Sequence, residues 1–320
     1  MPEYKACKEA FTDALLKLAR QNPDILIISS DSRGSCALNT YVQELPNQFV
    51  EVGIAEQNEV GIAAGLALSG KHPYVCAPAC FLTARALEQI KVDVAYSHQN
   101  VKIFGVSGGI SYGALGASHH TLHDIAVLRC FPDLQIIIPS DAVQTRAMLQ
   151  AIEQGTDATY IRVGRGKVPV IYNEHYSGEP FILGKANRLR EGSDLTLVAC
   201  GEMVYHTLQA AQLLREKGIQ ARVLDMATLK PFDEQAITEA AIDTGAILTI
   251  EEHSIYGGLG SIVTQVVSSN HPVPVKNLAI PDEYLITGES LELFAYYSLD
   301  AKGITDAAVR LFDLKRGFHA

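Results

Sequence analysis

Residues 51–70 read Glu51-Val52-Gly53-Ile54-Ala55-Glu56-Gln57-Asn58-Glu59, followed by Val60-Gly61-Ile62-Ala63-Ala64-Gly65-Leu66-Ala67-Leu68-Ser69-Gly70. The second half places Gly or Ala at nearly every second position, which lets another backbone approach closely. We therefore expect a tightly packed core or interface helix over residues 60–70. Glu56 would lose water where this helix begins, and buried carboxyl groups are often kept for a specific hydrogen bond. An ordinary first-turn acid, favoured by the helix dipole, is the alternative, and both interpretations stay open.

Strand and helix patterns alternate on both sides of this stretch. Continuous apolar runs predict strands buried in a parallel sheet. In the first half these runs lie at residues 25–30, 73–77, 101–106, 135–140 and 158–163. Helical patterns lie between them, at residues 4–20, 60–70, from 79 to 90, at 125–129 and at 141–154. We expect Ser140 to cap the last of these helices.

The second half repeats the alternation after a connector. Residues 166–190 carry two prolines and several glycines, with one short expected strand at 181–186. Strands are then expected at 195–200, 221–225 and 246–251, and helices at 203–217, 233–243, 262–268 and 304–311. The sequence therefore predicts an α/β protein with two doubly wound domains. We place these domains at residues 1–168 and 191–320, with a linker at 169–190.

Composition limits the function classes. The 320 residues carry 26 Lys and Arg against 36 Asp and Glu, a net charge of −10, and no basic block that would favour nucleic acid. We expect no signal peptide and no membrane span, since no apolar run reaches about 18 residues. The six cysteines form no Cys-x-x-Cys pair and are interpreted as reduced thiols, which predicts a cytoplasmic location.

Polar residues follow two of the expected strands at their carboxyl ends, where α/β sheets bind ligands. Asp31, Arg33 and Ser35 follow the strand at 25–30, and a simple polar turn is the alternative. Arg165 follows the strand at 158–163, where it could grip a phosphate or carboxylate or be an ordinary surface cation.

A glycine-rich loop, residues 107–120, is too long for a plain connection and so favours a functional role. Three histidines lie at the end of this loop or just after it: His119, His120 and His123. They allow three interpretations: a zinc pair of His119 and His123, packing and capping, or substrate contact with proton transfer. Asp124 next to them is interpreted as a first-turn acid of the helix at 125–129. Phe81 starts another helix and could be a plain core aromatic.

A Gly-Gly-x-Gly run at residues 257–260 precedes the helix at 262–268. Such a run could cradle an anion at the helix N-terminus, or it could only allow close packing. The sequence alone leaves both interpretations open.

Together these motifs resemble the transketolase family of thiamine diphosphate enzymes. The matching stretches follow one another along nearly the whole chain and are Ser30-Asp31-Ser32, Val52-Gly53-Ile54-Ala55-Glu56-Gln57-Asn58, Phe81, Gly116-Ala117-Ser118-His119-His120, Asp124-Ile125-Ala126, Ile138-Pro139-Ser140-Asp141, Glu251-Glu252-His253 and Gly257-Gly258-Leu259-Gly260. The resemblance implies a pyrimidine-binding domain followed by a transketolase C-terminal-like domain, roughly the back half of a full-length enzyme.

The front half of the family's enzymes has no counterpart in this sequence. The family's site for Mg²⁺ and diphosphate begins with Gly-Asp-Gly, and the 320 residues contain no Gly-Asp dipeptide. A divalent cation also needs several oxygen ligands, and no such cluster is visible, so we expect no metal site in this chain. The resemblance implies that thiamine diphosphate is shared with a partner chain. That partner, an N-terminal transketolase subunit, would hold Mg²⁺ and the diphosphate in an α2β2 assembly.

The resemblance also assigns the cofactor residues. Glu56 would hydrogen-bond the pyrimidine ring nitrogen and favour the imino tautomer that removes the thiazolium C2 proton. Phe81 would stack on the aminopyrimidine, and Asp31 would line the same pocket. The cofactor itself carries out the carbanion chemistry.

The substrate residues follow from the same resemblance. His119 would contact the substrate carbonyl or hydroxyl and assist proton transfer, and Arg165 would hold the anionic end of the substrate. We also expect His120, Arg33 and Ser35 to line the substrate site.

Four positions depart from the family pattern. Leu115 stands where the family has an Asp that reads a sugar hydroxyl, and Ser107 stands in place of a substrate histidine. Ala84 replaces an aromatic residue, and the arginine expected near Tyr4 is absent. An unpartnered hydroxyl has a large effect on selectivity. Our hypothesis is a two-carbon ketol transfer on a ketose other than the standard pentose phosphates.

Two other functions remain. The β subunit of a 2-oxoacid dehydrogenase has a similar size and domain order and would pass an acyl group to lipoamide. The adjacent pair His119-His120 and the Gly-Ile-Ala-Glu-Gln run favour transketolase. A non-catalytic regulatory subunit is the second alternative, and the presence of Glu56 and Phe81 argues against it.

Overall fold

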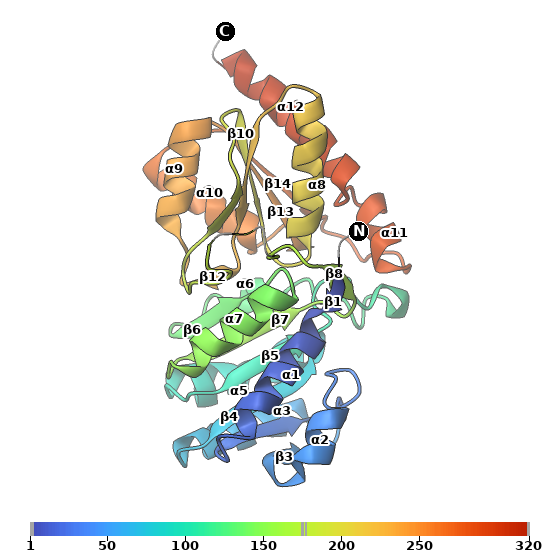
Figure 1. The fold of residues 1–320 in the computed structure, drawn as a ribbon, viewed down its shortest axis with the longest axis vertical. Helices are drawn as coiled ribbons and strands as arrows, with labels where there is room; N and C mark the ends of the chain where they lie inside the picture. The colour runs from blue at the N-terminus through green and yellow to red at the C-terminus, as the bar shows by residue number, and fades with distance from the viewer. Residues whose placement is uncertain (1–2, 174–175, 177, 319–320) are drawn as a thin grey trace.

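Two α/β units lie one above the other in the computed structural model, which describes residues 3–173, 176 and 178–318 (Figure 1). The expected fold class is confirmed. Residues 174, 175 and 177 of the expected linker lie outside the described residues, as do residues 1, 2, 319 and 320 at the ends of the expected domains. The domain boundaries given above stay a prediction.

The first unit is built on a seven-stranded sheet in the order β12-β6-β7-β5-β4-β2-β3. All neighbours are parallel except β12 and β6. Its strands are β2 (Ile25–Ser29), β3 (Phe49–Glu51), β4 (His72–Pro78), β5 (Lys102–Val106), β6 (Leu134–Ile137), β7 (Ala158–Val163) and β12 (Thr228–Lys230). Its helices are α1 (Cys7–Ala19), α2 (Asn39–Glu44), α3 (Glu56–Leu68), α4 (Ala79–Arg85), α5 (Leu87–Gln89), α6 (Asp124–Leu128) and α7 (Ala142–Glu153). A π-helical segment, Ile90–Tyr96, follows α5, and short 3-10 turns lie at Pro46–Gln48 and Gly113–Leu115.

The continuous apolar strands of this sheet are buried on both faces. Ile27 packs into one hydrophobic core with α1 and α7, whereas its neighbour Ile28 packs into another with α3, α4 and α6. Successive side chains of a strand point to opposite faces, so strands covered on both sides need apolar residues at every position. On the α1 side, the ring of Phe11 stacks on Phe104 at 3.8 Å between ring centroids.

The second unit is built on a five-stranded sheet in the order β14-β13-β10-β11-β9, with only β9 antiparallel to its neighbour. Its strands are β9 (Asn187–Arg190), β10 (Leu195–Ala199), β11 (Ala221–Asp225), β13 (Ile247–Ser254) and β14 (Val275–Ile280). Its helices are α8 (Met203–Glu216), α9 (Glu234–Thr244), α10 (Leu259–Asn270), α11 (Ser290–Tyr296) and α12 (Ala301–Phe318). A two-stranded sheet pairs β1 (Tyr4–Ala6) with β8 (Lys167–Pro169).

The two units share backbone pairing as well as a core. Strand β12 follows β11 in the chain but leaves the second sheet and pairs with β6 of the first, with Thr228 opposite Ile137. Apolar residues of both units, among them Ile138, Leu229 and Ile237, belong to one hydrophobic cluster. The relative position of the units is therefore fixed by hydrogen bonds and by packing.

Residues 4–6, expected to begin a helix, form β1 instead, and two further sequence expectations were wrong. Asp141, not Ser140, caps α7: its Oδ1 accepts from the backbone N–H of Val143 and Gln144 at 2.9 and 2.8 Å. Ser140 instead donates to the buried carboxylate of Asp225 at 2.8 Å. The short strand expected at 181–186 is absent, and the strand that pairs with β11 starts at residue 187.

Among the described residues no helix has the length and apolar character needed to cross a membrane. All six cysteines are unpaired thiols.

Candidate active site

Glu56 is the first residue of α3, directly after the turn that leaves β3. Gly53 in this turn has φ +71°, a conformation that a residue with a Cβ rarely adopts. The Glu56 side chain is only 4% exposed, and its Oε1 accepts a hydrogen bond from Arg85 Nη1 at 2.6 Å. Its burial and its single specific partner favour a functional carboxylate over an ordinary first-turn acid.

Arg85 was not among the residues singled out from the sequence. It ends α4, and its guanidinium carbon lies 4.1 Å from the ring centroid of Phe81, one turn earlier on the same helix. The spacing of four between an aromatic and an arginine on one expected helix was the signal that could have found it. Arg85 therefore covers both the Phe81 ring and the Glu56 carboxylate.

His119 lies beside the same aromatic ring. The ring centroids of Phe81 and His119 are 5.2 Å apart, and those of His119 and Tyr112 are 5.3 Å apart, both edge to face. Ser118 Oγ lies 2.9 Å from His119 Nδ1 and restrains the imidazole. His119 thus lies beside Phe81 and Tyr112, and Arg85 links Phe81 to Glu56; the roles that the resemblance assigns to Glu56, Phe81 and His119 stay predictions.

A cationic group lies on the far side of Tyr112. The Arg165 guanidinium stacks over the Tyr112 ring at 4.4 Å, and Ser35 Oγ lies 3.1 Å from the Tyr112 hydroxyl. Lys8 Nζ donates to the backbone carbonyl of Ser35 at 3.1 Å. Burial and the nearby charge of Arg165 lower the pKa of Lys8. Arg165, Lys8 and Ser35 therefore lie close to the Tyr112 ring. A cavity of about 630 Å³ next to them is lined by Arg165, Tyr112 and Leu115.

Asp31 and Arg33 lie in the turn after β2, and both are exposed. Asp31 has φ +52°, and its backbone N–H donates to Glu51 Oε1 at 2.7 Å. The left-handed conformation is one that Asp tolerates better than most residues, which explains its place in this turn. Contact of Asp31 with a cofactor, and of Arg33 with a substrate, stays a prediction.

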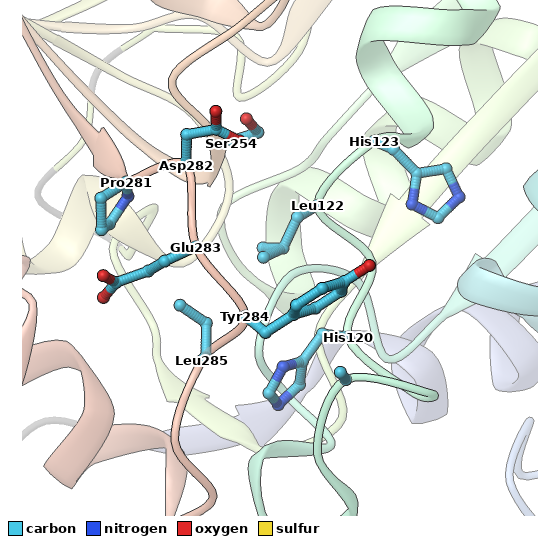
Figure 2. Close-up of a pocket in the computed structure, with 10 residues that line it drawn as sticks. His120, Leu122, His123, Ser254, Pro281, Asp282, Glu283, Tyr284 and Leu285 are labelled. Carbon is cyan, nitrogen blue, oxygen red and sulfur yellow. The ribbon is translucent and has the colours of Figure 1, made fainter.

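His120 lines a different cavity, of about 460 Å³, where the two units meet. Figure 2 shows His120 and His123 on the loop of the first unit, and Tyr284 on the segment of the second unit at the same cavity. His120 is 6% exposed, and burial lowers its pKa. Within the residues that the structure describes, no three His, Cys, Asp or Glu side chains form a possible metal site.

Asp124 is an acid in the first turn of α6, as the sequence predicts. The structure adds that its side chain is fully buried. Arg162 Nε lies 3.1 Å from Asp124 Oδ2, and the Tyr160 hydroxyl donates to the same oxygen at 2.7 Å. His253 Nε2 lies 3.8 Å from Oδ1, and burial lowers the pKa of His253 to about 4, so the ring is neutral near pH 7.

The glycine run before α10 serves close packing. Glu251, buried in β13, accepts from the backbone N–H groups of Leu259 and Gly260 at 2.7 and 2.8 Å. A Cβ on Gly258 would overlap the Glu251 carboxylate. The helix N-terminus is therefore capped by a side chain of this chain, and the anion-cradle interpretation of residues 257–260 was wrong.

Four buried or partly buried glutamates predict an unusual dependence of stability on pH. Burial is the main cause that raises the pKa of Glu59 to about 8 and of Glu251 to about 7. Burial also raises the pKa values of Glu202 and Glu252, whose carboxyl groups face each other. All four exceed 4.5, the ordinary value. The stability that the protonated forms contribute is complete below pH 4.5 and is lost as the pH rises through the folded-state values.

We therefore expect the free energy of unfolding to fall between pH 6.5 and pH 8. Each proton retained only by the folded state contributes a slope of about 1.4 kcal/mol per pH unit. Glu252→Gln should reduce this slope, because the amide does not titrate. Guanidinium unfolding at pH 6.5, 7.25 and 8 measures the slope. His253 has an ordinary pKa of 6.5, so its protonation in the unfolded chain opposes the slope at the low end of this range and fades towards pH 8. Stability that is constant or rises over this range would contradict the expectation.

Two family models match the chain. "Transketolase, pyrimidine binding domain" matches residues 3–170, and "Transketolase, C-terminal domain" matches residues 184–304. The chain is 57% identical over 305 residues to one subunit of the apulose-4-phosphate transketolase of Phocaeicola vulgatus, covering 95% of this chain and 96% of the relative. It is 35% identical over 308 residues to "6-deoxy-6-sulfo-D-fructose transketolase subunit SqwH" of Clostridium sp., covering 96% and 95%.

Solved structures of transketolases also superpose on this chain. One titled "Split gene transketolase, inactive beta4 tetramer" superposes with a TM-score of 0.86 at 38% identity, covering 97% of this chain and 99% of that one. The transketolase of Campylobacter jejuni superposes with a TM-score of 0.83 at 17% identity. The match covers 97% of this chain but 47% of that enzyme, and at this identity the likeness concerns the fold.

Proposed function

The chain belongs to the transketolase family, and we propose that it is the C-terminal subunit of a two-chain, thiamine diphosphate-dependent transketolase. It would transfer a two-carbon ketol unit from a ketose donor to an aldose acceptor. Relatives that it matches over nearly their whole length are named as subunits of transketolases. The observation that carries the proposal is the buried Glu56 carboxylate, which Arg85 links to the ring of Phe81 beside His119.

The residues around Glu56 fit the pyrimidine half of the cofactor. Among the described residues, Arg85 is the only hydrogen-bond donor to the Glu56 side chain, and the Arg85 side chain is itself 47% exposed. Arg85 also covers the Phe81 ring, so movement of this one half-exposed side chain would free an acceptor and an aromatic face together. Glu56 would hold the proton of a ring nitrogen, and Phe81 would support the ring. Bound thiamine diphosphate supplies a stabilised carbanion.

The diphosphate and Mg²⁺ are assigned to a partner. Within the described part of the chain no cluster of oxygen ligands could hold a divalent cation. An N-terminal subunit with the Gly-Asp-Gly turn would supply these ligands, and we propose an α2β2 assembly in the cytoplasm. The 38% identical structure is titled inactive as a β4 tetramer, which supports a need for a second kind of subunit.

The substrate side fits a phosphorylated sugar. Arg165 and Lys8, with the Ser35 and Tyr112 hydroxyls, offer charge and hydrogen bonds to an anionic end. His119 lies between this group and Phe81, where it would exchange protons with a hydroxyl or carbonyl of the substrate.

The donor ketose is proposed to be apulose 4-phosphate. Leu115, 53% exposed, lines the cavity beside Arg165 in place of the carboxylate expected to read a hydroxyl. A site without that acceptor discriminates against sugars that need it. The 57% identical relative is named for apulose 4-phosphate.

A reconstitution assay tests the function. The chain would be combined with a candidate N-terminal subunit, thiamine diphosphate and Mg²⁺, and transfer from apulose 4-phosphate and xylulose 5-phosphate would be compared. We expect kcat/KM to be roughly 10-fold or more higher for apulose 4-phosphate. Either subunit alone serves as the control and should be inactive.

Each other outcome of this assay has a meaning. Equal or faster transfer from xylulose 5-phosphate would reject the proposed donor. Acyl transfer to lipoamide would assign the chain to a 2-oxoacid dehydrogenase. Stable assembly and cofactor binding without any transfer would identify a regulatory subunit.

A further inference from the structure

Residues of the second unit contact the glycine-rich loop of the first unit, which carries His119 and Tyr112. We call residues 107–120 the substrate loop. Ser290 Oγ, at the start of α11, donates to the Ile110 carbonyl at 3.2 Å, and the Gly288 N–H donates to the Gly113 carbonyl at 3.3 Å. A Cβ on Gly113 would overlap the Gly288 carbonyl, so the two backbones are in close contact. The position of the substrate loop therefore depends on residues far away in the sequence.

Glu252 makes the shortest of these connections. It lies in β13, is buried, and its Oε1 accepts from the Ile110 N–H at 2.6 Å. Gly109 has φ +61°, and a Cβ there would overlap the Glu252 carboxylate. The Glu252 carbonyl accepts from Arg162 Nη2 at 2.6 Å, and the Arg162 side chain fills the space beside Gly108. Residues 108–110 thus pack against the Glu252 carboxylate and the Arg162 side chain.

We propose that Glu252 is a positioning residue of the transketolase site. By fixing the Ile110 amide it sets where Tyr112 and His119 lie relative to Phe81 and Arg165. The inference rests on the proposed function, because those four side chains form the proposed site. Tyr112 follows Ile110 by two residues and contacts both His119 and Arg165. A displacement of about 1 Å at such a site can lower a rate about 100-fold.

The type of side chain supports a positional role. Burying a carboxyl group costs free energy, and an apolar residue of similar volume is often at least as stabilising. The groups that face Glu252 are Glu202 before α8, Arg162 on β7 and Asp124 on α6. Glu202 lies against Gly164, the residue before Arg165, so that a Cβ at that position would overlap it. Glu252 therefore packs against the substrate loop, and Glu202 packs against the segment that carries Arg165.

The test compares two neighbouring glutamates in the assembled pair. In Glu252→Ala, KM for the phosphorylated donor should rise about 10-fold, while the affinity for thiamine diphosphate, measured by calorimetry, stays unchanged. Glu252→Gln keeps an oxygen that accepts from Ile110 and should restore a KM near that of the wild type. Glu251→Ala is the matched control. It removes a buried carboxyl group of the same strand whose contacts lie in α10, so KM should not change.

A readout without turnover separates this inference from the proposed function. Amide hydrogen exchange of the full chain should show faster exchange in residues 108–116 for Glu252→Ala and not for Glu251→Ala. If Glu252→Ala does not fold, Ser290→Ala removes the neighbouring bond to Ile110 and should accelerate exchange in the same residues. Equal exchange and equal KM in the two alanine variants would overturn the role of Glu252. A wild-type pair that transfers no ketol unit would reject the function but leave the exchange test valid.

Discussion

Glu56→Gln is expected to lower ketol transfer by the reconstituted pair at least 100-fold. The amide has the shape of the carboxylate and can still accept from Arg85, but it carries no charge to hold a proton at the ring nitrogen of the cofactor. The loss should appear in kcat for every donor ketose, because cofactor activation precedes any contact with the sugar. Steady-state kinetics at saturating thiamine diphosphate and Mg²⁺ measure it.

Glu59→Gln is the matched control for this variant. Glu59 lies one turn later on α3, is equally buried, and accepts from the backbone N–H of Cys76 at 3.1 Å instead of facing Phe81. Its amide variant should keep kcat within about threefold of the wild type, since a glutamine oxygen can accept the same bond. Unchanged turnover in Glu56→Gln would reject the catalytic role, and equal losses in both variants would indicate a general disturbance of α3.

Arg165→Ala should raise KM for the phosphorylated donor by about 10- to 100-fold. A charge-assisted hydrogen bond contributes about 1.5–3 kcal/mol, which corresponds to that range of affinity. Lys8 remains nearby and prevents a complete loss of binding. We expect little change in kcat, because Arg165 contacts Tyr112 and not the groups around Glu56. Initial-rate kinetics with the reconstituted pair separate the two constants.

Two comparisons make this result specific. The unphosphorylated donor sugar should have the same KM with the wild type and with Arg165→Ala. Lys167→Ala removes an exposed cation two residues away in β8 and should leave KM unchanged. An equal rise of KM for both forms of the sugar would show that Arg165 supports the loop rather than the phosphate.

The sequence predicts those elements whose pattern is local. Strand β5 and its parallel neighbours are continuous apolar runs because helices cover both faces of the sheet. Strands β3, β9, β12 and β14 were missed, and each of them lies at the edge of its sheet. The pairing of β12 with β6 joins residues about 90 positions apart, which no local period encodes.

The site divides in the same way. Glu56 and His119 were singled out because each belongs to a motif in one short stretch, and Phe81 because of its place in the resemblance; the structure places Phe81 beside His119 and links it to Glu56 through Arg85. Tyr112 and Lys8 were missed, since they meet Arg165 only through the fold. Asp124 was correctly predicted as a first-turn acid, but its burial beside Arg162 was not, because a first-turn acid has the same sequence pattern in both environments.

Strand β12 follows β11 of the second sheet in the chain but pairs in the first sheet, and this limits where the gene for this protein could be divided. A break between the two units would remove the edge strand of the first sheet and leave β6 with unpaired amide and carbonyl groups. Exposed edges of that kind recruit other strands and promote aggregation. Descendants of this polypeptide are therefore expected to inherit both units in one reading frame.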